Sequence, residues 1–257
     1  MIEHTFHLPR PEGEMEVFVV CPAGAGASPA VILYMDMWGL RATLLDIARG
    51  VAAAGYYCVL PDLYYRRGKV RYAARDIAGL KLAFADLEPE RQIALRAAMD
   101  GLSDAMVIED TAALLDALSH DASVRHGPVG AVGYCMGGRH ALCVAGTFPH
   151  RIKATACLHG AGCVTADDNS PHLLARRADG ELYCGHAERD QYAPPDLMER
   201  LEQALSGCRV RYHWRVHAGA EHGYAMPDRN VFDRKATEQD WETIFAMLGR
   251  QLRREAA

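Results

Sequence analysis

One cysteine stands where a catalytic nucleophile is expected. Cys135 is the centre of a G-x-C-x-G sequence at residues 133–137, which follows an apolar run at 129–134 and precedes a helical pattern. At such a strand-to-helix turn the backbone is strained, and glycines two residues before and after the nucleophile avoid collisions. The first amides and the positive dipole end of the following helix would favour a thiolate. The alternative is a glycine-rich turn around a buried structural cysteine.

An acid and a base follow Cys135 in the order that a nucleophile–acid–base triad requires. Asp190 lies in a loop after the apolar run at 181–184, and His222 lies between the last predicted strand and the C-terminal helix. We expect Asp190 to orient His222, and His222 to accept the proton of Cys135. Glu188 is the nearest alternative acid, and Asp190 could instead cap the helix that follows it.

A metal site is the other chemistry that this region could support, because His186 and His217 lie near the expected acid and base. No H-E-x-x-H sequence occurs there, and no cysteine or histidine pair has the spacing of a structural zinc site. The sequence therefore predicts neither a metal nor another cofactor.

A further carboxylate, Asp36, ends the apolar run at 30–35 and begins a loop with Met37 and Trp38. A carboxylate at such a place is costly unless it has a partner or a role. Asp36 could therefore act in catalysis, or it could hydrogen-bond the amides of its own loop. We expect the amides of Met37 and Met136 to form the oxyanion hole.

Predicted strands and helices alternate along the chain. The predicted strands are 15–21, 30–35, 56–60, 129–134, 153–158, 181–184 and 210–216, and the predicted helices are 44–54, 89–118, 138–147, 194–205 and 233–253. The first strand alternates and follows a turn at 11–13, which favours an antiparallel edge strand, whereas the others are more continuously apolar, as buried parallel strands are. The pattern predicts an α/β fold with a mostly parallel central sheet flanked by helices, in one domain over residues 1–257. Residues 65–89 are expected to form a connection beside the active site.

Composition excludes several other classes of protein. The chain has 257 residues, half of them hydrophobic, which is ample for a large core. No apolar run reaches the about 18 residues that cross a bilayer, and the N-terminal residues do not resemble a signal peptide, so we expect a cytoplasmic protein without a membrane partner. The 28 basic residues are spread among 33 acidic ones, which disfavours nucleic acid as a partner. Eight scattered cysteines without a C-x-x-C pair indicate reduced thiols.

The chain resembles the dienelactone hydrolase family of α/β-hydrolases, also called carboxymethylenebutenolidases. The resemblance extends from about Glu14 to Leu252 and rests on the cysteine elbow, the segments 61–64 and 221–224, and the loop around Asp190. It implies an α/β-hydrolase fold with a triad of Cys135, His222 and Asp190. It also implies a role for position 36, where family members carry a glutamate that takes the thiol proton as substrate binds. Asp36 is one methylene shorter than that glutamate.

Substrate recognition departs from the family's pattern at one position. Members that cleave dienelactone anchor the substrate carboxylate partly with an arginine four residues beyond the catalytic histidine, and this chain has Met226 there. Arg229 or Arg91 could replace that anchor, although arginines are more often solvated at the surface. Aromatic residues at loop ends could line the pocket or simply pack. The residues that could bind substrate are therefore Trp38, Tyr64, Arg91, Tyr224 and Arg229.

Taken together, these patterns predict a cysteine-dependent hydrolase of a small lactone or ester. One alternative is a broad carboxylesterase or thioesterase, and another is a non-catalytic module in which Cys135 binds a ligand or senses oxidants. Catalysis is favoured because all three triad residue types are present in their expected loops. The sequence does not rank the possible substrates, and it fits a monomer or a homodimer.

Overall fold

A single mixed sheet forms the centre of the computed structural model, which describes residues 1–24, 26–71 and 84–253. The strands are β1 (Ile2–Arg10), β2 (Gly13–Cys21), β3 (Ala30–Tyr34), β4 (Tyr57–Pro61), β5 (Val129–Tyr134), β6 (Ile152–Leu158), β7 (Glu181–Arg189) and β8 (Arg211–Glu221). Within the described residues they pair in the order β1-β2-β4-β3-β5-β6-β7-β8. The six strands β4, β3, β5, β6, β7 and β8 are parallel to one another. The pairs β1–β2 and β2–β4 are antiparallel. The predicted α/β fold with a mostly parallel sheet is thus confirmed.

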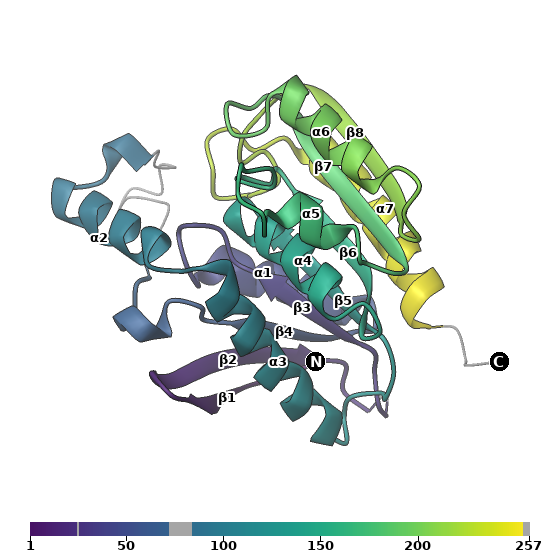
Figure 1. Cartoon of the computed structure of the whole chain (residues 1–257). Helices are drawn as coiled ribbons and strands as arrows, with labels where there is room; N and C mark the ends of the chain where they lie inside the picture. Colours follow the sequence, from purple (N-terminus) through teal and green to yellow (C-terminus); the bar gives the residue numbers. More distant parts are fainter. Residues whose placement is uncertain (25, 72–83, 254–257) are drawn as a thin grey trace.

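Helices cover both faces of this sheet. They are α1 (Ala42–Ala53), α2 (Pro89–Asp100), α3 (Asp104–His120), α4 (Met136–Thr147), α5 (Pro171–Ala175), α6 (Pro195–Leu205) and α7 (Arg234–Leu252), with short 3₁₀ turns at Tyr65–Arg67 and Phe84–Asp86. In Figure 1, α3, α4 and α5 lie in front of the sheet, and α1 and α7 lie behind it. Every residue of β3, β4 and β5 is buried, as expected for strands covered on both sides.

The structure differs from the sequence prediction at the edge of the sheet, in the predicted helix 89–118 and in the short helix α5, which the sequence did not predict. The edge strand is β1, and β2 lies between β1 and β4, because β1 pairs with β2 through the turn before Gly13. The residues of β1 are mostly exposed, so it lacks the apolar run that marks a buried strand. The predicted helix 89–118 is two helices, because Ser103 caps a new one by accepting a hydrogen bond from the amide of Met106. The expected connection at 65–89 lies partly outside the described residues.

The topology brings the functional loops together. In a parallel sheet the carboxyl ends of the strands lie at one edge, and ligands bind in the crevice outside them. Asp36 follows β3, Cys135 follows β5, Asp190 follows β7 and His222 follows β8.

Among the described residues, no helix is long and apolar enough to cross a membrane.

Candidate active site

Cys135 lies at a strained turn between β5 and α4. Its φ of 54° and ψ of −119° place a non-glycine residue where L-amino acids are strained. A Cβ at Gly133 would collide with the backbone of Gly137 and Gly138, and a Cβ at Gly137 would collide with the Tyr34 carbonyl oxygen. The turn is therefore possible only with glycine at both positions, as the G-x-C-x-G sequence predicts.

An imidazole joins this cysteine to a buried carboxylate. The Nε2 atom of His222 lies 3.2 Å from Sγ of Cys135, and its Nδ1 atom lies 2.8 Å from Oδ2 of Asp190. The other carboxylate oxygen of Asp190 accepts a hydrogen bond of 2.8 Å from the amide of Tyr192, whose ring packs edge-on against His222. The imidazole is thus held on both nitrogens, and the three residues that the sequence placed far apart form one chain of contacts.

The charge state of His222 follows from these contacts. Burial lowers the pKa of His222, but the hydrogen bonds to Asp190 and Cys135, together with their negative charges, raise it to about 10. The imidazolium is therefore the favoured form at neutral pH when the sulfur carries a negative charge. A cation next to a cysteine stabilises the thiolate, which is the nucleophilic form.

Tyr64 links the two loops that carry the expected oxyanion donors. Its hydroxyl donates a hydrogen bond of 3.0 Å to the carbonyl of Met37 and lies 3.6 Å from the sulfur of Met136. Met136 is the first residue of α4, and the first amides of a helix have no carbonyl partner within it. Tyr64 is itself buried, and its hydroxyl connects the loop of Met37 to the start of α4.

Asp36 is part of a buried ionic cluster with Arg41 and Asp228. Both carboxylate oxygens of Asp36 accept hydrogen bonds from Arg41, at 2.6 and 2.9 Å, and Oδ1 also accepts one of 3.0 Å from the amide of Trp38. The same guanidinium donates to Asp228 at 2.5 and 3.2 Å. Burial raises the pKa of Asp228, but the hydrogen bond and the charge of Arg41 lower it by more than burial raises it. The pKa is therefore below its ordinary value, and this carboxyl stays ionised. Asp36 is therefore held by a guanidinium that does not release a proton.

Arg229 lies over the ring of Trp38, with its guanidinium carbon 4.4 Å from the ring centroid. Its buried Nη1 atom has no hydrogen-bond partner among the described residues. Burial lowers the pKa of Arg229, an effect that the nearby charge of Asp36 opposes. Trp38 in turn packs with Leu87 and with Leu95 of α2, so Arg229 contacts an aromatic residue of the apolar cluster that joins the loop of Met37 and Trp38 to α2.

The structure does not bring every expected residue to this cluster. The hydroxyl of Tyr224 is buried and donates to Asp240, and its ring packs against His217. Arg91 is an exposed residue of α2, a helix that projects to the side of the sheet in Figure 1. Glu188, the alternative acid, accepts a hydrogen bond from the amide of Gly219.

Two parts of the site were not anticipated from the sequence. The first is Asp240 of α7, which is fully buried and accepts hydrogen bonds from Tyr183 and Tyr224. Asp240 also contacts Nε2 of His217 at 2.6 Å. This network supports the loop that carries His222. His159 follows β6 with a φ of 37°, and its ring lies edge-on to His222 with centroids 5.1 Å apart. Burial and the charge of His222 hold the pKa of His159 well below its ordinary value.

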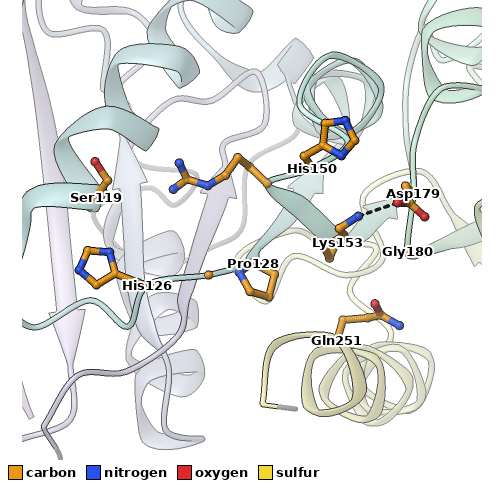
Figure 2. Close-up of a pocket in the computed structure, with 10 residues that line it drawn as sticks. Ser119, His126, Pro128, His150, Lys153, Asp179, Gly180 and Gln251 are labelled. Atoms are coloured by element: carbon orange, nitrogen blue, oxygen red, sulfur yellow. Dashed lines mark hydrogen bonds and ion pairs between the residues drawn. The ribbon is translucent and has the colours of Figure 1, made fainter. Parts of the chain in front are cut away.

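A metal cluster or another cavity could mark a different functional site. Across the part of the chain that is described, no three His, Cys, Asp or Glu side chains are arranged to hold a metal ion. A cavity of about 550 Å³ is lined mostly by residues that precede β5, β6 and β7, among them His126, His150 and Asp179, and also by Lys153 of β6 and Gln251 of α7 (Figure 2). It therefore lies at the amino ends of the strands, opposite Cys135.

Comparisons with known proteins identify the family of this chain. A model of the dienelactone hydrolase family matches residues 15–252. The chain belongs to the dienelactone hydrolase family. A carboxymethylenebutenolidase of Rhodococcus opacus is 26% identical over 231 residues, which cover 88% of this chain and 83% of that protein.

Solved structures with the same fold extend over nearly the whole chain. One from Klebsiella pneumoniae has a TM-score of 0.82 at 21% identity and covers 97% of this chain and 98% of its own. A dienelactone hydrolase-like promiscuous phosphotriesterase from metagenomic libraries has a TM-score of 0.78 at 18% identity, with 98% of each chain covered. The predicted resemblance to the dienelactone hydrolase family and its α/β-hydrolase fold are thus confirmed.

Proposed function

We propose that this member of the dienelactone hydrolase family is a cysteine-dependent hydrolase of a small lactone or ester. The observation that supports the proposal is the contact chain from Cys135 through His222 to Asp190, at 3.2 and 2.8 Å. Distances of this size are within the range of a nucleophile and a base that is oriented by a third group.

In this mechanism Sγ of Cys135 attacks the substrate carbonyl, and His222 holds the thiol proton as an imidazolium. The amides of Met37 and Met136 bind the oxyanion, and His222 protonates the leaving oxygen. His222 then takes a proton from water, which attacks the thioester and releases the acid. Asp190 keeps Nδ1 of His222 as the donor, so that Nε2 faces the sulfur.

Asp36 is the alternative acceptor of the thiol proton. Both of its oxygens accept hydrogen bonds from Arg41, whereas Nε2 of His222 contacts the sulfur directly. We therefore assign the proton to His222 and assign Asp36 the role of fixing Arg41 and the Trp38 amide.

Arg229 is the group that we propose to bind a carboxylate on the substrate. A guanidinium nitrogen that has no partner among the described residues and is held against an aromatic ring is suited to a planar anion. A carboxylate here would also offset the cost of burying the charge. Arg91 on the exposed surface of α2 is the weaker candidate.

The test is hydrolysis by the parent and by Cys135→Ala. We measure both on a panel of lactones, open-chain esters and thioesters, each with and without a free carboxylate. The alanine variant is expected to fall to the rate of the uncatalysed reaction, because the sulfur that forms the acyl-enzyme is gone. Cys208→Ser, which removes a partly exposed thiol on the segment after α6, is the control and should match the parent. Parent-like hydrolysis by a folded Cys135→Ala protein would contradict the assignment.

A further inference from the structure

A pair of cysteines, Cys157 and Cys163, lies close to the active site. Sγ of Cys157, near the end of β6, is 3.7 Å from Sγ of Cys163, in the loop that follows. A disulfide has an S–S distance of about 2.05 Å, so the sulfurs need to approach by only about 1.7 Å. The residue between them in space is Gly160, where a Cβ would collide with both sulfur atoms.

The two thiols differ in ways that suit a redox pair. Cys163 is partly exposed, so a small oxidant can reach it, whereas Cys157 is buried. Hydrogen bonds with Cys163 and Cys184, followed by burial, raise the pKa of Cys157 well above its ordinary value and keep it a thiol. Cys163 is therefore the thiol that meets the oxidant, and Cys157 is placed to resolve the product.

The loop between these cysteines touches the catalytic residues directly. The amide of Ala161 donates a hydrogen bond of 3.1 Å to the carbonyl of Cys135, and the ring of His159 packs edge-on against His222. The carbonyl of Cys163 is tied to α5 by the amide of His172 at 2.9 Å. Moving Cys163 toward Cys157 would therefore shift residues 159–162 against Cys135 and His222.

We propose that Cys157 and Cys163 form a redox-sensitive dithiol, and that a hydroperoxide converts it to a disulfide that slows turnover at Cys135. The thiolate of Cys163 attacks the O–O bond, becomes a sulfenic acid and releases an alcohol or water once the leaving oxygen is protonated. The thiol of Cys157 attacks the sulfenic sulfur, the S–S bond forms, and water leaves with the thiol proton. Two electrons pass from the thiols to the peroxide, and a reducing dithiol reverses the change.

The formation of the disulfide is tested by peptide mapping in a Cys135→Ser background with hydrogen peroxide as the oxidant. Trypsin releases Cys157 and Cys163 together in residues 154–176 and Cys184 in residues 178–189. We expect peptide 154–176 to become two hydrogens lighter and resistant to thiol alkylation, and dithiothreitol to reverse this. Additional Cys208→Ser should leave the result unchanged, and additional Cys163→Ser should abolish it. Peptide 154–176 with both thiols still alkylated, or joined to 178–189, would overturn the proposal.

The effect on turnover rests on the proposed hydrolase function, whereas the peptide map reads the disulfide whether or not hydrolysis is found. With Cys135 present, peroxide should reduce kcat/KM at least about tenfold in the parent and in Cys208→Ser, because a misplacement of about 1 Å can cost up to about 100-fold. Cys163→Ser should keep more activity, since only direct oxidation of Cys135 remains. If peroxide reduced kcat/KM equally in the parent and in Cys163→Ser, and dithiothreitol restored both equally, the link between the disulfide and turnover would be overturned.

Discussion

Two carboxylates flank the candidate nucleophile, and their partners give them different properties. Asp190 contacts an imidazole, whose proton can move, whereas Asp36 is bound by the guanidinium of Arg41, whose proton does not. Both side chains are almost fully buried. Burial near a nucleophile therefore does not by itself make a carboxylate catalytic, because the group that the carboxylate bonds determines what it can do.

The two carboxylates also differ in the cost of burial. Asp190 has one titratable partner and one amide, so its charge is balanced only when His222 is protonated. Asp36 shares Arg41 with Asp228, which leaves two buried anions around one buried cation. The charge of Asp190 therefore favours the transfer of a proton to His222. Asp36 instead belongs to a fixed ionic cluster that holds the loop of Met37 and Trp38.

Asp190→Asn tests the catalytic side of this comparison and is expected to have the largest effect. The amide cannot stabilise the imidazolium or hold its tautomer, so kcat/KM should fall by about 10⁴-fold, as when a triad carboxylate becomes an amide. Glu188→Gln is the matched control, because Glu188 lies on the same segment and bonds the amide of Gly219. A loss confined to Glu188→Gln would identify the other carboxylate as the acid.

The same variant gives a pH dependence of stability. The pKa of His222 is raised to about 10 in the folded protein, against about 6.5 in an unfolded chain. The stability from this shift is fully present below about pH 6.5 and is lost as the pH rises through about 10. Urea unfolding of the parent and of Asp190→Asn should therefore differ most near pH 6, with the difference shrinking at higher pH. A difference that grows with pH would contradict the shift.

Arg41→Met tests the structural side. It leaves Asp36 and Asp228 buried without their shared cation, and breaking a buried ion pair in this way costs about 3–5 kcal/mol of unfolding free energy. Urea unfolding measures the loss. Neutralising the anions as well, in Arg41→Met with Asp36→Asn and Asp228→Asn, should recover part of the stability. A single variant as stable as the parent would show that the cluster is not the fixed anchor described above.

Local sequence patterns predicted the parts of the site that depend on local geometry. The elbow at Cys135 follows from two glycines at a strand-to-helix turn, and Asp190 and His222 follow from their places after β7 and β8. The same reasoning missed β1, whose exposed residues carry no apolar pattern. A break in helix propensity at Gly101 and the cap residue Ser103 were signals that could have divided the helix predicted at 89–118.

The contacts that sequence could not supply join residues that are distant in the chain. Arg41 and Asp228 are 187 positions apart, and nothing in either local segment indicates a partner. Asp240 lies within the amphipathic pattern of α7, where a carboxylate is ordinarily on the solvated face, yet it is fully buried. His159 lies in no recognisable motif, and its positive φ, its unpartnered ring nitrogens and its contact with His222 are seen only in the described structure.

Asp36→Asn is expected to leave the reactivity of Cys135 unchanged. If His222 alone holds the thiol proton, iodoacetamide should alkylate Cys135 in this variant at the parent's rate at every pH, because Asp36 bonds Arg41 whereas His222 contacts the sulfur. Alkylation is followed on the peptide that contains Cys135, so that other thiols do not contribute. His222→Gln is the comparison variant and should alkylate more slowly near neutral pH, since it removes the cation that stabilises the thiolate. Slower alkylation in Asp36→Asn, with a shifted pH profile, would move Asp36 from the fixed cluster to the proton-transfer path, and the two carboxylates would then share one chemical role.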